Sequence, residues 1–138
     1  MTFTQHMIPH HRQALEMAEL VQSRTTRPEL VKLAGDITNT QGDEISRMQR
    51  WLQRWGKPEG MTAMDHHQMA MPGMMDHAEV GRFMGLEDAQ FDVAFVDMMS
   101  RHHQGAIVMA NTEAPTVEPW YARRRDTTLY RLPSPLAW

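Results

Sequence analysis

The sequence of 138 residues contains no cysteine. This absence excludes a disulfide scaffold, a cysteine-based zinc finger, an iron–sulfur cluster and a cysteine nucleophile. Long apolar runs are also missing, since none approaches the roughly 18 residues that a membrane-spanning helix needs. Positive charge is not in excess, because the formal net charge is −3 and the pI is near 6.2. A domain that binds nucleic acid is usually basic, so we expect neither a nucleic-acid partner nor a membrane span.

Methionine and histidine are abundant instead, with 14 and 8 residues respectively. Thioether sulfur prefers Cu(I), while imidazole suits copper in both oxidation states as well as zinc and nickel. A site made of these two kinds of ligand also avoids thiolates, which would oxidise in a compartment outside the cytosol. The composition therefore predicts copper as the metal, with Cu(I) favoured and Cu(II) also accepted, and no organic cofactor.

An internal repeat organises these residues. The segment 3–18 reads FTQHMIPHHRQALEMA and the segment 95–110 reads FVDMMSRHHQGAIVMA. With a constant offset of 92 positions, seven of the sixteen residues are identical, including both residues of the HH pair. We infer a duplicated two-helix unit.

Each copy of the repeat predicts a helix with an unusual face. At about 100° per residue, imidazoles and thioethers share the side that should be core, together with one small alanine. The candidate ligands on or beside this face are His6, Met7, His10, His11 and Met17 in the first copy, and Met98, Met99, His102, His103 and Met109 in the second. The small residues Ala14 and Ala106 allow two helices to approach closely, so we expect His10 to lie near His102.

Two further helical segments follow from periodicity. Residues 29–55 carry an apolar stripe that Gly56 and Pro58 bring to an end; its members are Leu30, Ala34, Ile37, Gln41, Ile45, Met48, Leu52 and Trp55. Residues 88–112 form the helix of the second unit, with Asp88 as its N-cap. Pro9 either kinks the first helix or is its first residue.

The segment 56–86 is expected to be a linker, and its centre is biased in composition. Residues 61–77 have no core period, and Pro72 with Gly73 should break any helix there. Nine of these seventeen residues are potential ligands: Met61, Met64, His66, His67, Met69, Met71, Met74, Met75 and His77. We expect this segment to be mobile and to contact metal without imposing one geometry.

The last segment, 113–138, has no methionine or histidine and holds four of the eight prolines. The repeat predicts a partner helix at this position, and the prolines argue against it. We therefore divide the chain into a Met/His helical domain over 1–112, whose first unit spans 3–55, and a divergent tail. We hypothesise that the second unit has lost or altered its partner helix through a change of reading frame near residue 113.

Simpler interpretations stay open for single residues. Methionine at helical spacing is usually core filler, so Met17, Met48 and Met109 are more often core than ligands. For Gln41 and Glu44, a hydrogen bond to a buried histidine, in support of a metal ligand, is favoured over a catalytic role.

The repeated F-x-x-x-M-x-x-HH-x-x-A-x-x-MA pattern, with QxxEIxxMxxxL over 41–52, closely resembles the bacterial domain-of-unknown-function 305 family. The resemblance covers residues 3–112. It implies an all-α, ferritin-like helical bundle, and a periplasmic or secreted copper-binding protein linked to copper resistance. It also implies metal ligands, which carry over onto Met7, His10, His11, Met17, Met48, Met99, His102, His103 and Met109, and onto the methionines and histidines of the linker.

Two departures from the family pattern change the expected architecture. Members of the family usually have a leader or anchor, which we do not expect from residues 1–11, and the sequence after residue 112 predicts no QxxEIxxM helix. With three long helices instead of four, one side of the core should be uncovered. We therefore expect a homodimer or a higher oligomer.

Three functions compete at this point. The first is a copper-binding protein that buffers, sequesters or passes on the ion to a copper-transfer protein, without turnover. The second is a helical interaction domain that binds no metal, and the third is a copper-dependent redox enzyme. A di-iron oxidase is disfavoured, because its Glu-x-x-His motifs do not occur in the sequence.

Overall fold

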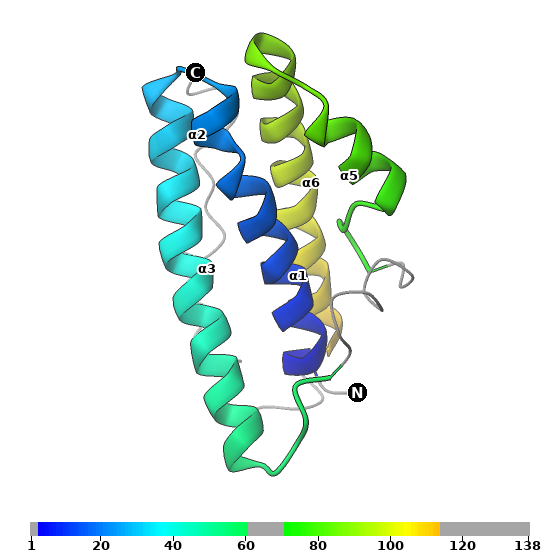
Figure 1. Cartoon of the computed structure of the whole chain (residues 1–138). Coiled ribbons are helices and arrows are strands. Elements are labelled where there is room, and N and C mark those ends of the chain that lie inside the picture. The colour runs from blue at the N-terminus through cyan, green and yellow to red at the C-terminus, as the bar shows by residue number, and fades with distance from the viewer. Residues whose placement is uncertain (1–2, 61–70, 114–138) are drawn as a thin grey trace.

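The computed structural model describes residues 3–60 and 71–113, and these form helices and connecting turns. The helices are α1 (Phe3–Glu19), α2 (Val21–Arg24), α3 (Pro28–Arg54), α5 (His77–Met84) and α6 (Asp88–Glu113). Figure 1 shows α1, α3 and α6 as three long helices side by side, with α1 antiparallel to both of the others. The all-α class and the three long helices are as predicted. No helix in the described ranges is long and apolar enough to cross a membrane.

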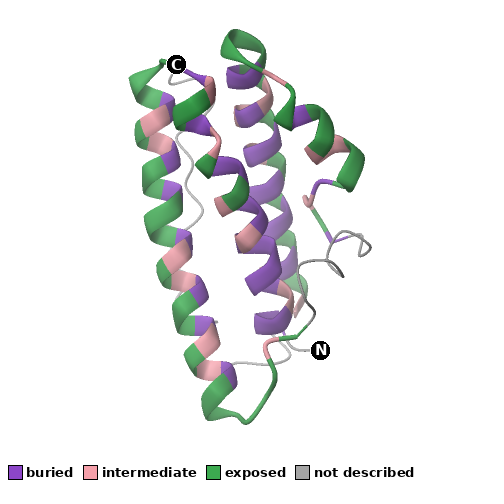
Figure 2. Cartoon of the chain, viewed as in Figure 1, coloured by how far each residue is buried: buried purple, intermediate pink, exposed green. Residues whose placement is uncertain are grey.

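The helix α3 follows the predicted stripe closely. It starts with Pro28, whose fixed φ suits the first turn of a helix, and it ends at Arg54. Seven of the eight stripe residues are buried, so α3 presents one covered face, as Figure 2 shows. The exception is Trp55, which is 41% exposed because the helix ends before it and the chain turns at Gly56 with φ +61°.

The other two long helices differ slightly from expectation. The helix α1 begins at Phe3 and runs through Pro9, so a start at Pro9 is wrong and His6 lies on the helix. The helix α6 begins at Asp88 itself, with a φ of +50°, and extends one residue past the predicted end.

The core has two clusters, and each joins opposite ends of the two repeats. One cluster combines Ala14, Met17 and Ala18 of α1 with Phe91, Phe95, Met98 and Met99 of α6. The other combines Phe3, Met7 and Ile8 of α1 with Ala106 and Met109 of α6. The start of one copy therefore packs against the end of the other. This arrangement places the two HH pairs between the clusters, at the centre of the α1–α6 contact.

The expectation for the linker is wrong in its second half. Met71 and Met75 are buried, one in each core cluster, and residues 77–84 form the helix α5. Sequence periodicity missed α5 because the helix is only eight residues long and buries a single side chain, Phe83. The predictions for Met61, Met64, His66, His67 and Met69, and for the tail beyond residue 113, lie outside the described residues. The division into domains stays a prediction.

Candidate functional site

Two histidines from equivalent positions of the repeat meet at the middle of the bundle. The ring centroids of His10 and His102 are 3.8 Å apart, with the ring planes at 38°. Their exposed fractions are 0% and 1%. The expected approach of these residues is thus confirmed. It arises because the antiparallel crossing of α1 and α6 brings the same repeat position together from both copies.

A backbone contact fixes the tautomer of His10. Its Nε2 lies 2.9 Å from the carbonyl oxygen of Pro72, which can only accept a hydrogen bond, so Nε2 donates. The lone pair of the neutral ring is therefore on Nδ1. This atom is buried and has no hydrogen-bond partner, and the same is true of Nε2 of His102. Each ring of the pair thus holds a buried nitrogen that makes no hydrogen bond.

The second histidine of each pair is held by α3 or by its own helix. Nε2 of His11 donates to a carboxylate oxygen of Glu44 over 2.7 Å, which leaves Nδ1 of His11 buried and unpartnered. Nδ1 of His103 donates to the carbonyl oxygen of Met99 over 2.8 Å, and its Nε2 faces the amide nitrogen of Gln41 at 3.2 Å. The predicted hydrogen bonds from Gln41 and Glu44 to buried histidines are confirmed.

Burial favours the neutral form of three imidazoles of the site, those of His10, His102 and His103. Burial, aided by the neighbouring His11 and His103, lowers the pKa of His10 to about 4, although the hydrogen bond to the carbonyl of Pro72 opposes the shift. Burial and the proximity of His10 lower the pKa of His102 well below 6.5. Burial also lowers the pKa of His103. Because a metal binds the unprotonated ring, these histidines need lose no proton at neutral pH before they ligate.

The predicted methionine ligands lie in the core clusters that flank the histidines. One cluster holds Met7, Met48, Met71 and Met109, with Met74 packed against it, and the other holds Met17, Met75, Met98 and Met99. The core role that was favoured for Met17, Met48 and Met109 is confirmed. Thioether ligation by these residues stays a prediction.

Two predicted ligands are remote from this centre. Nδ1 of His6 pairs with a carboxylate oxygen of Glu113 over 2.7 Å, where the start of α1 meets the end of α6. His77 is exposed at the start of α5. Among the residues that the structure describes, no three or more histidine, aspartate or glutamate side chains form a group that could hold a metal ion.

The structure adds residues that sequence reasoning missed. Residues 71–75, here called the strap, cross α1 and α6 directly over the histidine pair. The side-chain amide of Gln13 donates to the carbonyl oxygen of Met75 and accepts from its N–H, both over 2.9 Å. On α6, Gly105 touches the strap so closely that an added Cβ would lie 1.9 Å from the carbonyl oxygen of Pro72.

A signal for these residues was present in the repeat. Gln13 and Gly105 occupy equivalent positions of the two copies, 92 residues apart, and they differ in type. One copy supplies an amide that binds the strap, and the other supplies the space for its backbone. The identities between the two copies mark their shared core face, so the signal for the strap lies in this difference of residue type.

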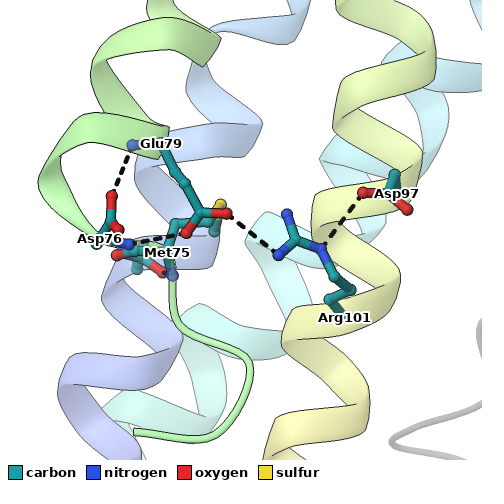
Figure 3. A network of polar contacts seen from close by, with 6 residues as sticks. Met75, Asp76, Glu79, Asp97 and Arg101 are labelled. Carbon is teal, nitrogen blue, oxygen red and sulfur yellow. Dashed lines mark hydrogen bonds and ion pairs between the residues drawn. The ribbon is translucent and has the colours of Figure 1, made fainter. Parts of the chain in front are cut away.

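The connection from the strap to α5 is shown in Figure 3. Asp76 and Glu79 form a capping box at the start of α5, where each side chain accepts from the backbone N–H of the other. Arg101 of α6 donates to Glu79 over 3.2 Å and pairs with Asp97 on its own helix at 3.3 Å. These contacts join the start of α5 to the same stretch of α6 that carries His102.

Comparisons with known proteins agree with this architecture. The family model of the domain of unknown function DUF305 matches residues 1–123. A DUF305 protein from Streptomyces coelicolor, described as a candidate secreted protein, is similar with 31% identity and a TM-score of 0.76, over 92% of this chain and 80% of that one. A DUF305 fragment from Deinococcus radiodurans has 35% identity and a TM-score of 0.75, over 88% and 79% of the two chains. CopM in its Cu(II)-bound form has 31% identity and a TM-score of 0.71, over 92% and 83%. No curated protein matches the chain.

Proposed function

The chain belongs to the DUF305 family, and on that premise we propose that it binds copper and sequesters, buffers or transfers the ion without turnover. The observation that carries the proposal is the contact between His10 and His102. Each ring holds a buried nitrogen without a hydrogen-bond partner. A buried polar atom usually finds a partner, so a pair of exceptions in one contact marks a place where a ligand is expected.

The chemistry of the surrounding residues supports copper over other metals. Neutral imidazole at the centre suits both oxidation states, and methionines of the two flanking clusters add soft sulfur that favours Cu(I). Glu44 would orient His11 as carboxylates orient metal-binding histidines in general. The resemblance to CopM, whose structure holds Cu(II), points to the same metal.

The proposal also covers the compartment and the partners of the chain. Since the histidine and methionine site contains no thiolate that would oxidise, it suits a compartment outside the cytosol, and one similar protein is described as a candidate secreted protein. We place the chain in the periplasm or outside the cell. Its partners are copper ions, a copper-transfer protein and a second copy of the chain.

Metal titration tests the proposal. The purified protein is titrated anaerobically with Cu(I), and separately with Cu(II), Zn(II) and Ni(II), while native mass spectrometry counts the bound ions. We expect at least one tightly bound Cu(I) that is lost in both His102→Ala and His102→Phe. The second variant retains a ring in the core if the first is poorly folded. The control His77→Ala removes an exposed histidine and should leave this ion in place.

Methionine ligation is tested separately from packing. Met48→Leu and Met109→Leu conserve volume and should cost less than about 1.5 kcal/mol of stability. If thioether sulfur holds Cu(I), each variant weakens Cu(I) binding while Cu(II) binding changes less. Absence of copper binding at micromolar metal would contradict the proposed function and favour the metal-free interaction domain.

A further inference from the structure

The histidine pair is closed off by the strap. The carbonyl oxygen of Pro72 accepts the hydrogen bond from His10, and an added Cβ on Gly73 would lie 3.0 Å from the Cα of His102. The backbone of the strap therefore rests on both histidine positions. Because both imidazoles are fully buried, an ion can reach their free nitrogens only if part of the structure moves.

The strap is held to the long helices by a small set of contacts. With the other residues that the structure describes, its polar contacts are the hydrogen bond from His10 and the two bonds between Gln13 and the backbone of Met75. Its apolar contacts are the side chains of Met71 and Met75, which enter different core clusters, and the partly buried side chain of Met74, which packs against the cluster of Met71. The long helices, by contrast, are held by continuous backbone ladders and by many buried side chains. Local opening is least costly where such contacts are few, so the strap should open before a helix does.

Ring geometry links this opening to ligation. The lone pair of an imidazole lies in the plane of the ring, and the two rings here are tilted by 38° with their centroids 3.8 Å apart. One ion bound by both rings therefore requires at least one ring to turn. A turn of His10 removes the donor from the carbonyl of Pro72 and weakens the strap on the same side.

We propose that the strap, residues 71–75, is the gate of the histidine site: it lifts from α1 and α6 to admit the ion, and Gln13 sets how often it lifts. This inference rests on the proposed copper function for the identity of the ion. Gln13 is a positioning residue in this scheme, since it acts through the backbone of Met75.

The test compares Gln13→Ala with Gln90→Ala, which removes an exposed glutamine from α6. In the metal-free protein, hydrogen exchange reports the opening of the strap at the N–H of Met75, and diethyl pyrocarbonate reports access to His10 and His102. Loss of two buried hydrogen bonds should raise the exchange at Met75 and the modification of both histidines by about tenfold or more. The amide exchange rates in α3 should change less. The control Gln90→Ala should show the same exchange and the same histidine modification as the parent protein.

Copper kinetics completes the test. With a gate, Gln13→Ala raises the rate of copper association and the rate of dissociation together, whereas loss of a ligand would raise dissociation alone. The gate is overturned if the N–H of Met75 and both imidazoles in the parent protein react only at the rate of global unfolding. If the strap opens as expected but the protein binds no copper, the proposed function is refuted. The inference that the strap controls access to the histidines would still hold. Copper binding with unchanged rates in Gln13→Ala would refute the gate alone.

Discussion

At the scale of single residues, the two HH pairs show how position within a bundle decides the role of a side chain. His10 and His102 are equivalent in the repeat and their rings lie in tilted contact, and each ring keeps one buried nitrogen without a hydrogen-bond partner. His11 and His103 are one residue further along, face α3, and are bonded by Glu44 and Gln41. One residue of displacement on a helix is about 100°, which separates the central contact from the α3 contact.

The low pKa of His10 predicts that the metal-free protein loses stability in mild acid. The pKa is near 6.5 when the chain is unfolded and about 4 when it is folded, so the unfolded state takes up the proton first. The free energy of unfolding is unaffected by this group above pH 6.5, and it falls by about 3 kcal/mol as the pH drops toward 4. Urea unfolding with a chelator, at intervals of pH, measures this loss.

A variant separates His10 from the other titrating groups. His10→Phe should flatten the decline in stability between pH 6.5 and 4, while His77→Ala, at an exposed position, should keep it. A parent protein whose stability is constant over that range would contradict the assignment of a buried neutral imidazole.

At the scale of elements, the backbone of the strap packs directly against the backbone of α6. Gly73 has a φ of +78°, which an L-residue rarely adopts, and Gly105 leaves no space for a side chain against the turn. The two glycines of α3 are different, since an added Cβ at Gly35 or Gly42 meets nothing within 4 Å. Glycine on α6 thus makes room for the backbone of the strap, whereas glycine on α3 only lowers the helix propensity.

This contrast predicts opposite effects of one substitution. Gly35→Ala should stabilise the protein by about 0.5–1 kcal/mol, because it lowers the entropy of the unfolded chain and fits an open position of α3. Gly105→Ala should destabilise it by about 1–3 kcal/mol, because the new methyl group collides with Pro72. Thermal and urea unfolding measure both changes. Equal effects of the two variants would show that the strap does not rest on α6 as described.

At the scale of the whole molecule, three long helices share two core clusters, and the expectation of association remains to be measured. The helix α6 carries Val93, Ile107 and Val108 as exposed large apolar residues, at 72%, 38% and 48%. These residues lie on the outer part of a helix whose other side holds the histidine pair. Such a helix, apolar on more than one side, is typical of one that is covered by a neighbour.

We therefore predict a homodimer or higher oligomer in solution. Sedimentation over a range of protein concentrations should show a species at twice the chain mass or more, and Val93→Glu with Ile107→Glu should shift the population toward monomer. A parent protein that sediments only as monomer at high concentration would refute the prediction. As a control, Asp43→Glu changes an exposed position of α3 and should leave the population unchanged.

Periodicity and the repeat determined a large part of this protein from sequence alone. The three long helices, the buried stripe of α3 and the meeting of His10 with His102 follow from side chains that recur at helical spacing, because burial of one helix face is a local property of the pattern. The bonding of Gln41 and Glu44 to histidines followed from polar residues at or beside an apolar stripe.

Only the tertiary structure decided what covers the histidines. The strap lies about 60 residues from the part of α1 that binds it, and its contacts use backbone atoms of Pro72 and Met75, whose position no side-chain pattern records. The helix α5 and the burial of Met71 likewise depend on neighbours that are distant in the chain. Sequence thus specified which residues face the centre, while the packing of a short, non-periodic segment against two helices decided how that centre is closed.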